Sequence, residues 1–88
     1  MMSLPAPRSY DSFPHGAQEL IRAAERLFGE RGVEGVTIRE LLEAAGQANK
    51  SAVHHYFGSK EELWIATLEY LFERYLETGR GLGFSRLL

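Results

Sequence analysis

Four side chains that can hydrogen-bond or carry charge fall within six residues of this chain: Lys50, Ser51, His54 and His55. A serine hydroxyl and an imidazole can each donate or accept a hydrogen bond, and an ammonium group donates three. Such groups on one surface could ligate a metal, carry out nucleophilic catalysis, or hydrogen-bond to the edges of nucleic-acid bases. Their spacing separates these possibilities.

The spacing argues against a metal site and against catalysis. His54 and His55 are adjacent, so on a helix their side chains point about 100° apart and cannot easily share one ion. No carboxylate lies at matching spacing, and the chain has no cysteine. Ser51 and His54 could touch, but nothing nearby would orient the histidine and no oxyanion loop is evident. We therefore expect no metal, no cofactor and no enzymatic activity.

The four side chains belong to a short predicted helix over residues 50–57. Ser51 and His55 point to one side of it, with Ala52 and His54 on the flanks. The opposite side is apolar and consists of Val53, Tyr56 and Phe57. The polar side is either a surface that reads bases or an ordinary solvated surface. The surrounding elements bear on this choice.

Two helices are predicted before this segment. Apolar residues at helical spacing indicate the first over residues 17–31. Thr37 and Glu40 form a capping box that begins the second, which Gly46 ends after about eight or nine residues. A helix this short is unstable alone, so packing must hold it. Its apolar stripe consists of Ile38, Leu41, Leu42 and Ala45.

A longer fourth helix is predicted to run to about Thr78, begun by a second capping box at Ser59 and Glu62. Its apolar residues cover an arc of about 140°, which is wider than packing on two short helices requires. We therefore expect a second buried face, against a partner subunit or a further domain. The residues proposed for this face are Trp64, Leu68, Leu71, Phe72 and Tyr75.

These elements predict an all-α fold, a small homeodomain-like bundle of three short helices and a longer fourth helix. Two short helices around a glycine-containing turn, braced on both sides, are typical of a helix-turn-helix. The 88 residues form one domain. We expect a flexible, proline-rich arm at residues 1–16, the helix-turn-helix domain at 17–78 and a glycine-rich tail at 79–88.

The segments AAERLFGERGVEGVTIRELLEAAG and NKSAVHHYFGSKEEL resemble the DNA-binding domain of TetR-family transcriptional regulators, and HHYFGSKEEL is their most specific part. The resemblance covers about two thirds of the chain. It implies sequence-specific binding of double-stranded DNA by a homodimer on a palindromic operator, as a repressor. In that family a C-terminal domain dimerises and binds a small effector. This chain ends before it, so an effector is expected only if that domain exists.

The resemblance also implies which residues hold the DNA backbone. Thr37, Tyr56 and Lys60 would contact phosphates, although Thr37 is first a helix cap and Tyr56 could serve only in packing. Arg39 could reach a base from outside the recognition helix. Lys50 could contact a guanine edge or a phosphate.

In the recognition helix, Ser51, His54 and His55 would face base edges. Ala52 would let the backbone approach or touch a thymine methyl group. The turn from Gly46 is one residue longer than the usual family spacing. This leaves the register of Asn49, Lys50 and Ser51 open by one position, and Asn49 is a candidate for the helix cap.

Composition fits this assignment. An apolar content of 44% and a charged content of 25% are ordinary for a soluble protein, and no apolar run approaches the ~20 residues of a membrane span. With no cysteine and no visible signal peptide, we expect a cytoplasmic protein without membrane contact. The net charge of −2 argues mildly against nucleic acid. However, residues 61–78 hold five Glu and one Arg, so the acid is concentrated in the fourth helix.

A second interpretation stays open. The chain could be a helical protein-interaction module, or a truncated regulator fragment without DNA binding of its own. Association through the fourth helix would then depend on Trp64 or Phe72 and weaken little with salt, whereas DNA binding would fall steeply with salt.

Overall fold

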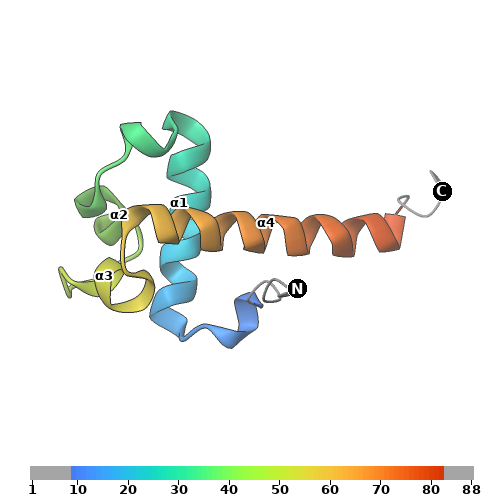
Figure 1. Cartoon of the computed structure of the whole chain (residues 1–88), viewed down its shortest axis with the longest axis horizontal. Coiled ribbons are helices and arrows are strands. Elements are labelled where there is room, and N and C mark those ends of the chain that lie inside the picture. Colours follow the sequence, from blue (N-terminus) through green and yellow to red (C-terminus); the bar gives the residue numbers. More distant parts are fainter. Residues whose placement is uncertain (1–8, 83–88) are drawn as a thin grey trace, which may run out of the picture.

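The computed structural model describes residues 9–82, and the side chains of residues 9–77. This part of the chain contains helices and no strand, as the all-α prediction requires. A first 3₁₀ turn, η1 (Tyr10–Ser12), leads into helix α1 (His15–Arg31), and a second, η2 (Val33–Gly35), follows it. Then come α2 (Ile38–Ala44), α3 (Ala52–Phe57) and α4 (Lys60–Leu82). Figure 1 shows α4 as a long rod that extends away from the compact group formed by α1, α2 and α3.

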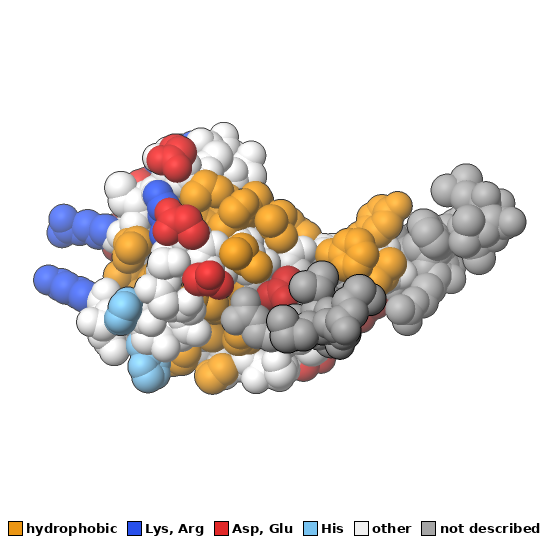
Figure 2. All heavy atoms as spheres, in the orientation of Figure 1, with side chains coloured by type: hydrophobic (Ala, Val, Ile, Leu, Met, Phe, Trp, Pro, Cys, Tyr) orange, Lys and Arg blue, Asp and Glu red, His pale blue; other side chains and the backbone are white. Residues whose placement is uncertain are grey.

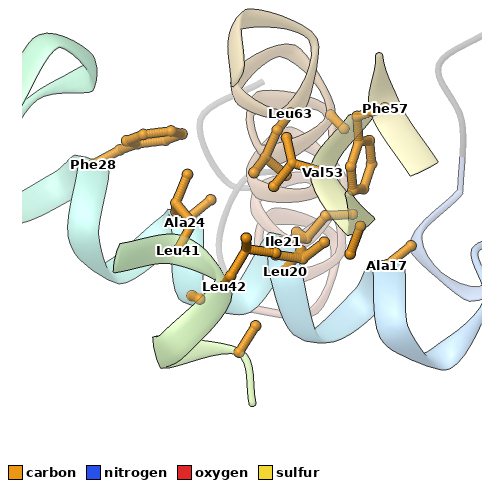
Figure 3. Close-up of a cluster of buried hydrophobic side chains, with 14 of the residues drawn as sticks. Ala17, Leu20, Ile21, Ala24, Phe28, Leu41, Leu42, Val53, Phe57 and Leu63 are labelled. Carbon is orange, nitrogen blue, oxygen red and sulfur yellow. The ribbon is translucent and has the colours of Figure 1, made fainter. Parts of the chain in front are cut away.

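Helix α1 lies at the centre of the bundle and contacts α2, α3 and α4. Its apolar stripe is buried, and side chains from all four α-helices meet against it (Figure 3). Burying a large aliphatic or aromatic side chain contributes about 1.5–3 kcal/mol, so this shared core holds the two short helices in place. Its largest members are Leu20, Ile21, Phe28, Leu41, Phe57 and Leu63.

The chain folds onto the bundle earlier than the sequence indicated. Helix α1 begins at His15 rather than Ala17, with Pro14 before it. The Tyr10 ring lies 4.5 Å from that of Tyr70, and the Phe13 ring lies 5.6 Å from that of Phe57. The flexible arm was predicted from its prolines. In the structure, the rings of Tyr10 and Phe13 contact α4 and α3. Residues 1–8 lie outside the described part.

The turn between α2 and α3 is also longer than expected. Gly46 has a φ of +67°, a backbone conformation that glycine adopts at little cost, and it ends α2. The Asn49 side-chain oxygen then accepts from the Ser51 amide at 2.9 Å, and the Ser51 carbonyl accepts from the His55 amide at 2.7 Å. Ser51 is therefore the residue that precedes α3, and Lys50 lies in the turn. Asn49 shapes the turn and is not the cap.

Helix α4 begins after Ser59, whose hydroxyl accepts from the Glu62 amide at 3.1 Å, and this bond is one half of the predicted capping box. It continues past Thr78 to Leu82, and residues 83–88 of the predicted tail lie outside the described part. Within residues 9–82, no helix combines the length and the apolar character that crossing a membrane requires.

The residues of the predicted partner face of α4 differ in how far they are exposed. Trp64 packs inside the domain, with its ring edge-to-face against Phe28 at 5.3 Å, and is only partly exposed. Leu71 is half-buried. The large apolar side chains of α4 that are exposed are Ile65, Leu68, Phe72 and Tyr75. Trp64 therefore also serves in packing against α1, which a helical wheel does not show, and its place on a partner face stays a prediction.

Candidate nucleic-acid interface

Helices α2 and α3 lie together at one end of the molecule, opposite the end to which α4 extends (Figure 1). Figure 2 shows Lys and Arg side chains projecting from this end, near the His side chains. The structure exposes most of the predicted interface here, namely Thr37, Arg39, Lys50, Ser51, His54 and His55. These residues come from α2, the turn and α3, so the fold brings them to one surface.

Ala52 does not belong to this surface. Its side chain is 2% exposed and is part of the core cluster. The prediction that its methyl group touches a base was wrong, because the side chain packs in the core. Its small size serves close packing of the helices.

Thr37 is held in a complete capping box. Its hydroxyl accepts from the Glu40 amide and donates to the Glu40 carboxylate, both at 3.1 Å, and the carboxylate also accepts from the Thr37 amide at 3.1 Å. Arg31 pairs with the same carboxylate at 2.6 Å. The backbone hydrogen bond from Thr37, followed by the side-chain bonds of Arg31 and Thr37, lowers the pKa of Glu40. The box thus confirms the predicted cap, and it commits the Thr37 hydroxyl to Glu40.

Lys60 makes contacts that the sequence did not indicate. Its side-chain nitrogen donates to the main-chain oxygens of Val33 and Val36, both at 3.0 Å. The side chain is half-buried. Two of its three N–H groups are therefore used to hold the segment before α2, and one is left for a phosphate.

Tyr56 lies across the start of α1. A Cβ atom at Gly16 would come 2.8 Å from the Tyr56 hydroxyl and 3.2 Å from the nearest ring carbon, so the ring occupies the space that only a glycine leaves open. The Tyr56 ring also contacts the His55 ring, and the two ring centroids lie 5.0 Å apart. Tyr56 is half-buried, so it serves in packing, and its predicted phosphate contact stays a prediction. Gly16 was missed because the sequence placed it in the arm.

The two histidines of α3 differ in their surroundings. His54 Nδ1 lies 2.9 Å from the Gly58 carbonyl oxygen. A carbonyl can only accept, so the neutral ring carries its proton on Nδ1 and leaves Nε2 as an acceptor. The His54 hydrogen bond therefore joins α3 to the turn before α4. His55, which is also exposed, lies beside Tyr56. Among residues 9–77, no three side chains of His, Cys, Asp or Glu come together in a way that could hold a metal ion.

Arg39 and Lys50 are the exposed cations of the α2 side. Arg39 lies 3.5 Å from the Glu43 carboxylate one turn further along, and both side chains are highly exposed. Such a pair is worth little in water and can be opened by a stronger anionic partner. Beside them, Ile38 is 42% exposed, although its place in the apolar stripe had assigned it to the core.

A helix-turn-helix braced by two longer helices, with an exposed polar side on its second short helix, defines a DNA-binding domain of the helix-turn-helix class. Residues 20–67 match the family model for bacterial regulatory proteins of the TetR family, and this chain belongs to that family. Members of the family regulate transcription by binding DNA and are not enzymes.

Two relatives illustrate the match. The transcriptional repressor AcnR of Corynebacterium efficiens is 43% identical over 61 residues, which cover 69% of this chain and 32% of that protein. The transcriptional regulator BetI of Brucella abortus is 41% identical over 72 residues, which cover 82% of this chain and 34% of that protein. The chain thus spans about a third of the length of these relatives. No solved structure gives a significant match.

Proposed function

We propose that this chain binds a palindromic operator in double-stranded DNA as a homodimer and acts as a repressor of transcription. The observation that carries the proposal is the convergence of Arg39, Lys50, Ser51 and His55 at one exposed end of the molecule. The name of the AcnR relative supports repression. Three of the five glutamates of α4, Glu69, Glu73 and Glu77, lie along the part of the helix that extends away from this end, so the net charge of −2 does not describe the end that meets DNA.

In this proposal α3 enters the major groove with Ser51 and His55 toward the base edges. Arg39 and Lys50 approach the same groove from α2 and the turn, where each can donate to guanine or to a phosphate. His54 presents Nε2 at the flank. Tyr56 and the free N–H of Lys60 contact phosphates at the rim. Thr37 contributes chiefly by fixing the start of α2, since its hydroxyl is bonded to Glu40.

A dimer follows from the size of the reading element. Helix α3 has six residues and covers too few base pairs for useful specificity alone. A two-fold dimer would place two copies of α3 in successive major grooves, about 34–36 Å apart. The open residues of α4, namely Leu68, Phe72 and Tyr75 together with half-buried Leu71, are our proposed dimer face.

The test is selection of binding sites from a random DNA pool by the purified chain, at low and at moderate salt. We expect one enriched palindrome and an affinity that falls linearly with the logarithm of salt concentration. Arg39→Ala should weaken binding to the selected site. Arg26→Ala, which removes the same charge from an exposed position of α1, is the matched control and should leave binding nearly unchanged.

A different result would favour the interaction-module interpretation. If no sequence is enriched, and if self-association survives high salt but is lost in Phe72→Ala, then α4 is the functional surface and the helix-turn-helix is a scaffold. Phe72 is 56% exposed, so this variant should fold normally.

A further inference from the structure

An open depression of about 340 Å³ lies at the DNA-facing end, next to α3 but not part of it. Ile38, Arg39 and Leu42 of α2 line one side, and Lys50 of the turn lines the other. It therefore forms where α2 and the turn meet, so the length of that turn determines its shape. Figure 2 shows hydrophobic surface beside the Lys and Arg side chains that project from this end.

The depression combines two kinds of chemistry. Ile38 is 42% exposed, which is unusual for a large aliphatic side chain in a helix whose other apolar residues, Leu41 and Leu42, are buried. Arg39 and Lys50 add two positive charges at the edge. Within the described residues, the only carboxylate paired with either cation is that of Glu43, on an exposed side chain. A ligand that matches this depression would present an apolar group between negative charges.

We propose that this depression is a specificity site that receives the C5 methyl group of one thymine in each half of the operator. In the major groove that methyl group is the apolar feature of an A·T pair, and it lies between the phosphates of the two strands. Ile38 provides the apolar contact, while Arg39 and Lys50 face the flanking phosphates. The proposal rests on the proposed function and adds a base that α3 does not read.

Position and charge favour DNA over a protein partner here. Residues of α2 and of the turn directly before α3 line the depression, so DNA that contacts Ser51 or His55 would also lie over it. A peptide or a second copy of this chain bound at this place would block the recognition helix. The cationic edge also matches a polyanion better than it matches the acidic helix α4 of another copy.

The experiment removes the thymine methyl group from the DNA and the Ile38 side chain from the protein in separate steps. Each thymine of one half-site in the selected operator is replaced by deoxyuridine, which lacks only that methyl group. Dissociation constants are then measured for the wild-type chain, for Ile38→Ala and for the control Ile65→Ala. Ile65 is an isoleucine of similar exposure, 46%, on α4.

At one thymine we expect deoxyuridine to weaken wild-type binding about fourfold, the effect of burying one methyl group. Ile38→Ala should weaken binding to the thymine operator by a similar factor, and it should be insensitive to the deoxyuridine replacement. Ile65→Ala should keep the full wild-type response.

The proposal is overturned if the wild-type chain and Ile38→Ala respond equally at every thymine. It is also overturned if no replacement weakens wild-type binding, although the proposed function then stands. Failure to select any operator would overturn the proposed function and this site together.

Discussion

The side-chain nitrogen of Lys60 donates a hydrogen bond to the main-chain oxygen of Val36 at 3.0 Å, across 24 residues of sequence. Its second bond, to the Val33 oxygen, has the same length. These bonds join the first residue of α4 to the segment directly before Thr37, which begins α2. A displacement of the start of α4 therefore acts on the first residues of the helix-turn-helix.

Replacement of Lys60 should affect stability more than electrostatics. Lys60→Met keeps the apolar stem and removes both hydrogen bonds, so we expect the free energy of unfolding to fall by about 2 kcal/mol. Because two N–H groups already serve the protein, the slope of log affinity against log salt should fall by less than the ~0.9 that a full phosphate contact gives. Urea unfolding and a salt titration of operator binding measure the two quantities.

Lys50→Met is the matched control for this prediction. Lys50 is exposed in the turn, so its replacement should change stability by less than about 0.5 kcal/mol and lower the salt slope instead. The opposite result would be that Lys60→Met keeps the full free energy of unfolding and lowers the salt slope by about one unit. Lys60 would then serve only as a phosphate contact.

Gly16 and Gly29 should respond oppositely to alanine. Both lie in α1, but a Cβ atom at Gly16 meets the Tyr56 hydroxyl at 2.8 Å, whereas one at Gly29 meets nothing within 4 Å. Gly29→Ala should stabilise the protein by about 1 kcal/mol through helix propensity. Gly16→Ala forces the Tyr56 ring to move, so it should be less stable than Gly29→Ala by about 1–2 kcal/mol.

The double variant Gly16→Ala with Tyr56→Ala identifies the cause. Once the ring is absent, alanine at position 16 should cost nothing further, which a double-mutant cycle in urea unfolding would show. Independent, additive effects of the two substitutions would contradict the close contact of Gly16 with Tyr56.

The Thr37–Glu40–Arg31 network should make stability depend on pH in the acid range. The pKa of Glu40 is lowered from 4.5 in the folded protein, so folding is favoured by its ionisation. This contribution is complete well above pH 4.5 and is lost as pH falls through the lowered folded value. The stability difference between the wild-type chain and Glu40→Gln should therefore shrink on acidification, as unfolding measured at a series of pH values would show.

Arg31→Met should raise the pH at which that contribution disappears, because Arg31 is one of the groups that lower the pKa of Glu40. The explanation fails if the wild-type chain and Glu40→Gln keep a constant difference down to the acid limit of folding.

Trp64 and Phe72 are both aromatic residues of α4, but we expect them to act differently. Trp64 packs on Phe28, so Trp64→Ala should lower the free energy of unfolding by about 2–3 kcal/mol. Phe72 is 56% exposed, so Phe72→Ala should change it by less than about 0.5 kcal/mol and weaken self-association instead. Unfolding curves and sedimentation of the two variants test this. Equal losses of stability would show that Phe72 is also packed within the chain.

The sequence alone determined the four helices, the caps of α2 and α4, and the family. Apolar spacing, the box of Thr37 and Glu40, and the cap at Ser59 act within a few residues, so local rules describe them correctly. The exposure of Arg39 and His55 also followed, because the polar sides of α2 and α3 are fixed by helical periodicity once their ends are known.

The tertiary structure decided which partner each side chain meets. Lys60 turns to the carbonyls of Val33 and Val36, Trp64 packs on Phe28, and Gly16 makes room for Tyr56. Ala52 is buried and Ile38 is exposed, contrary to prediction, because the packing of whole helices decides which side chains are covered. These contacts join residues far apart in sequence. Burial and hydrogen bonding at such positions depend on how whole helices pack, which no local pattern encodes.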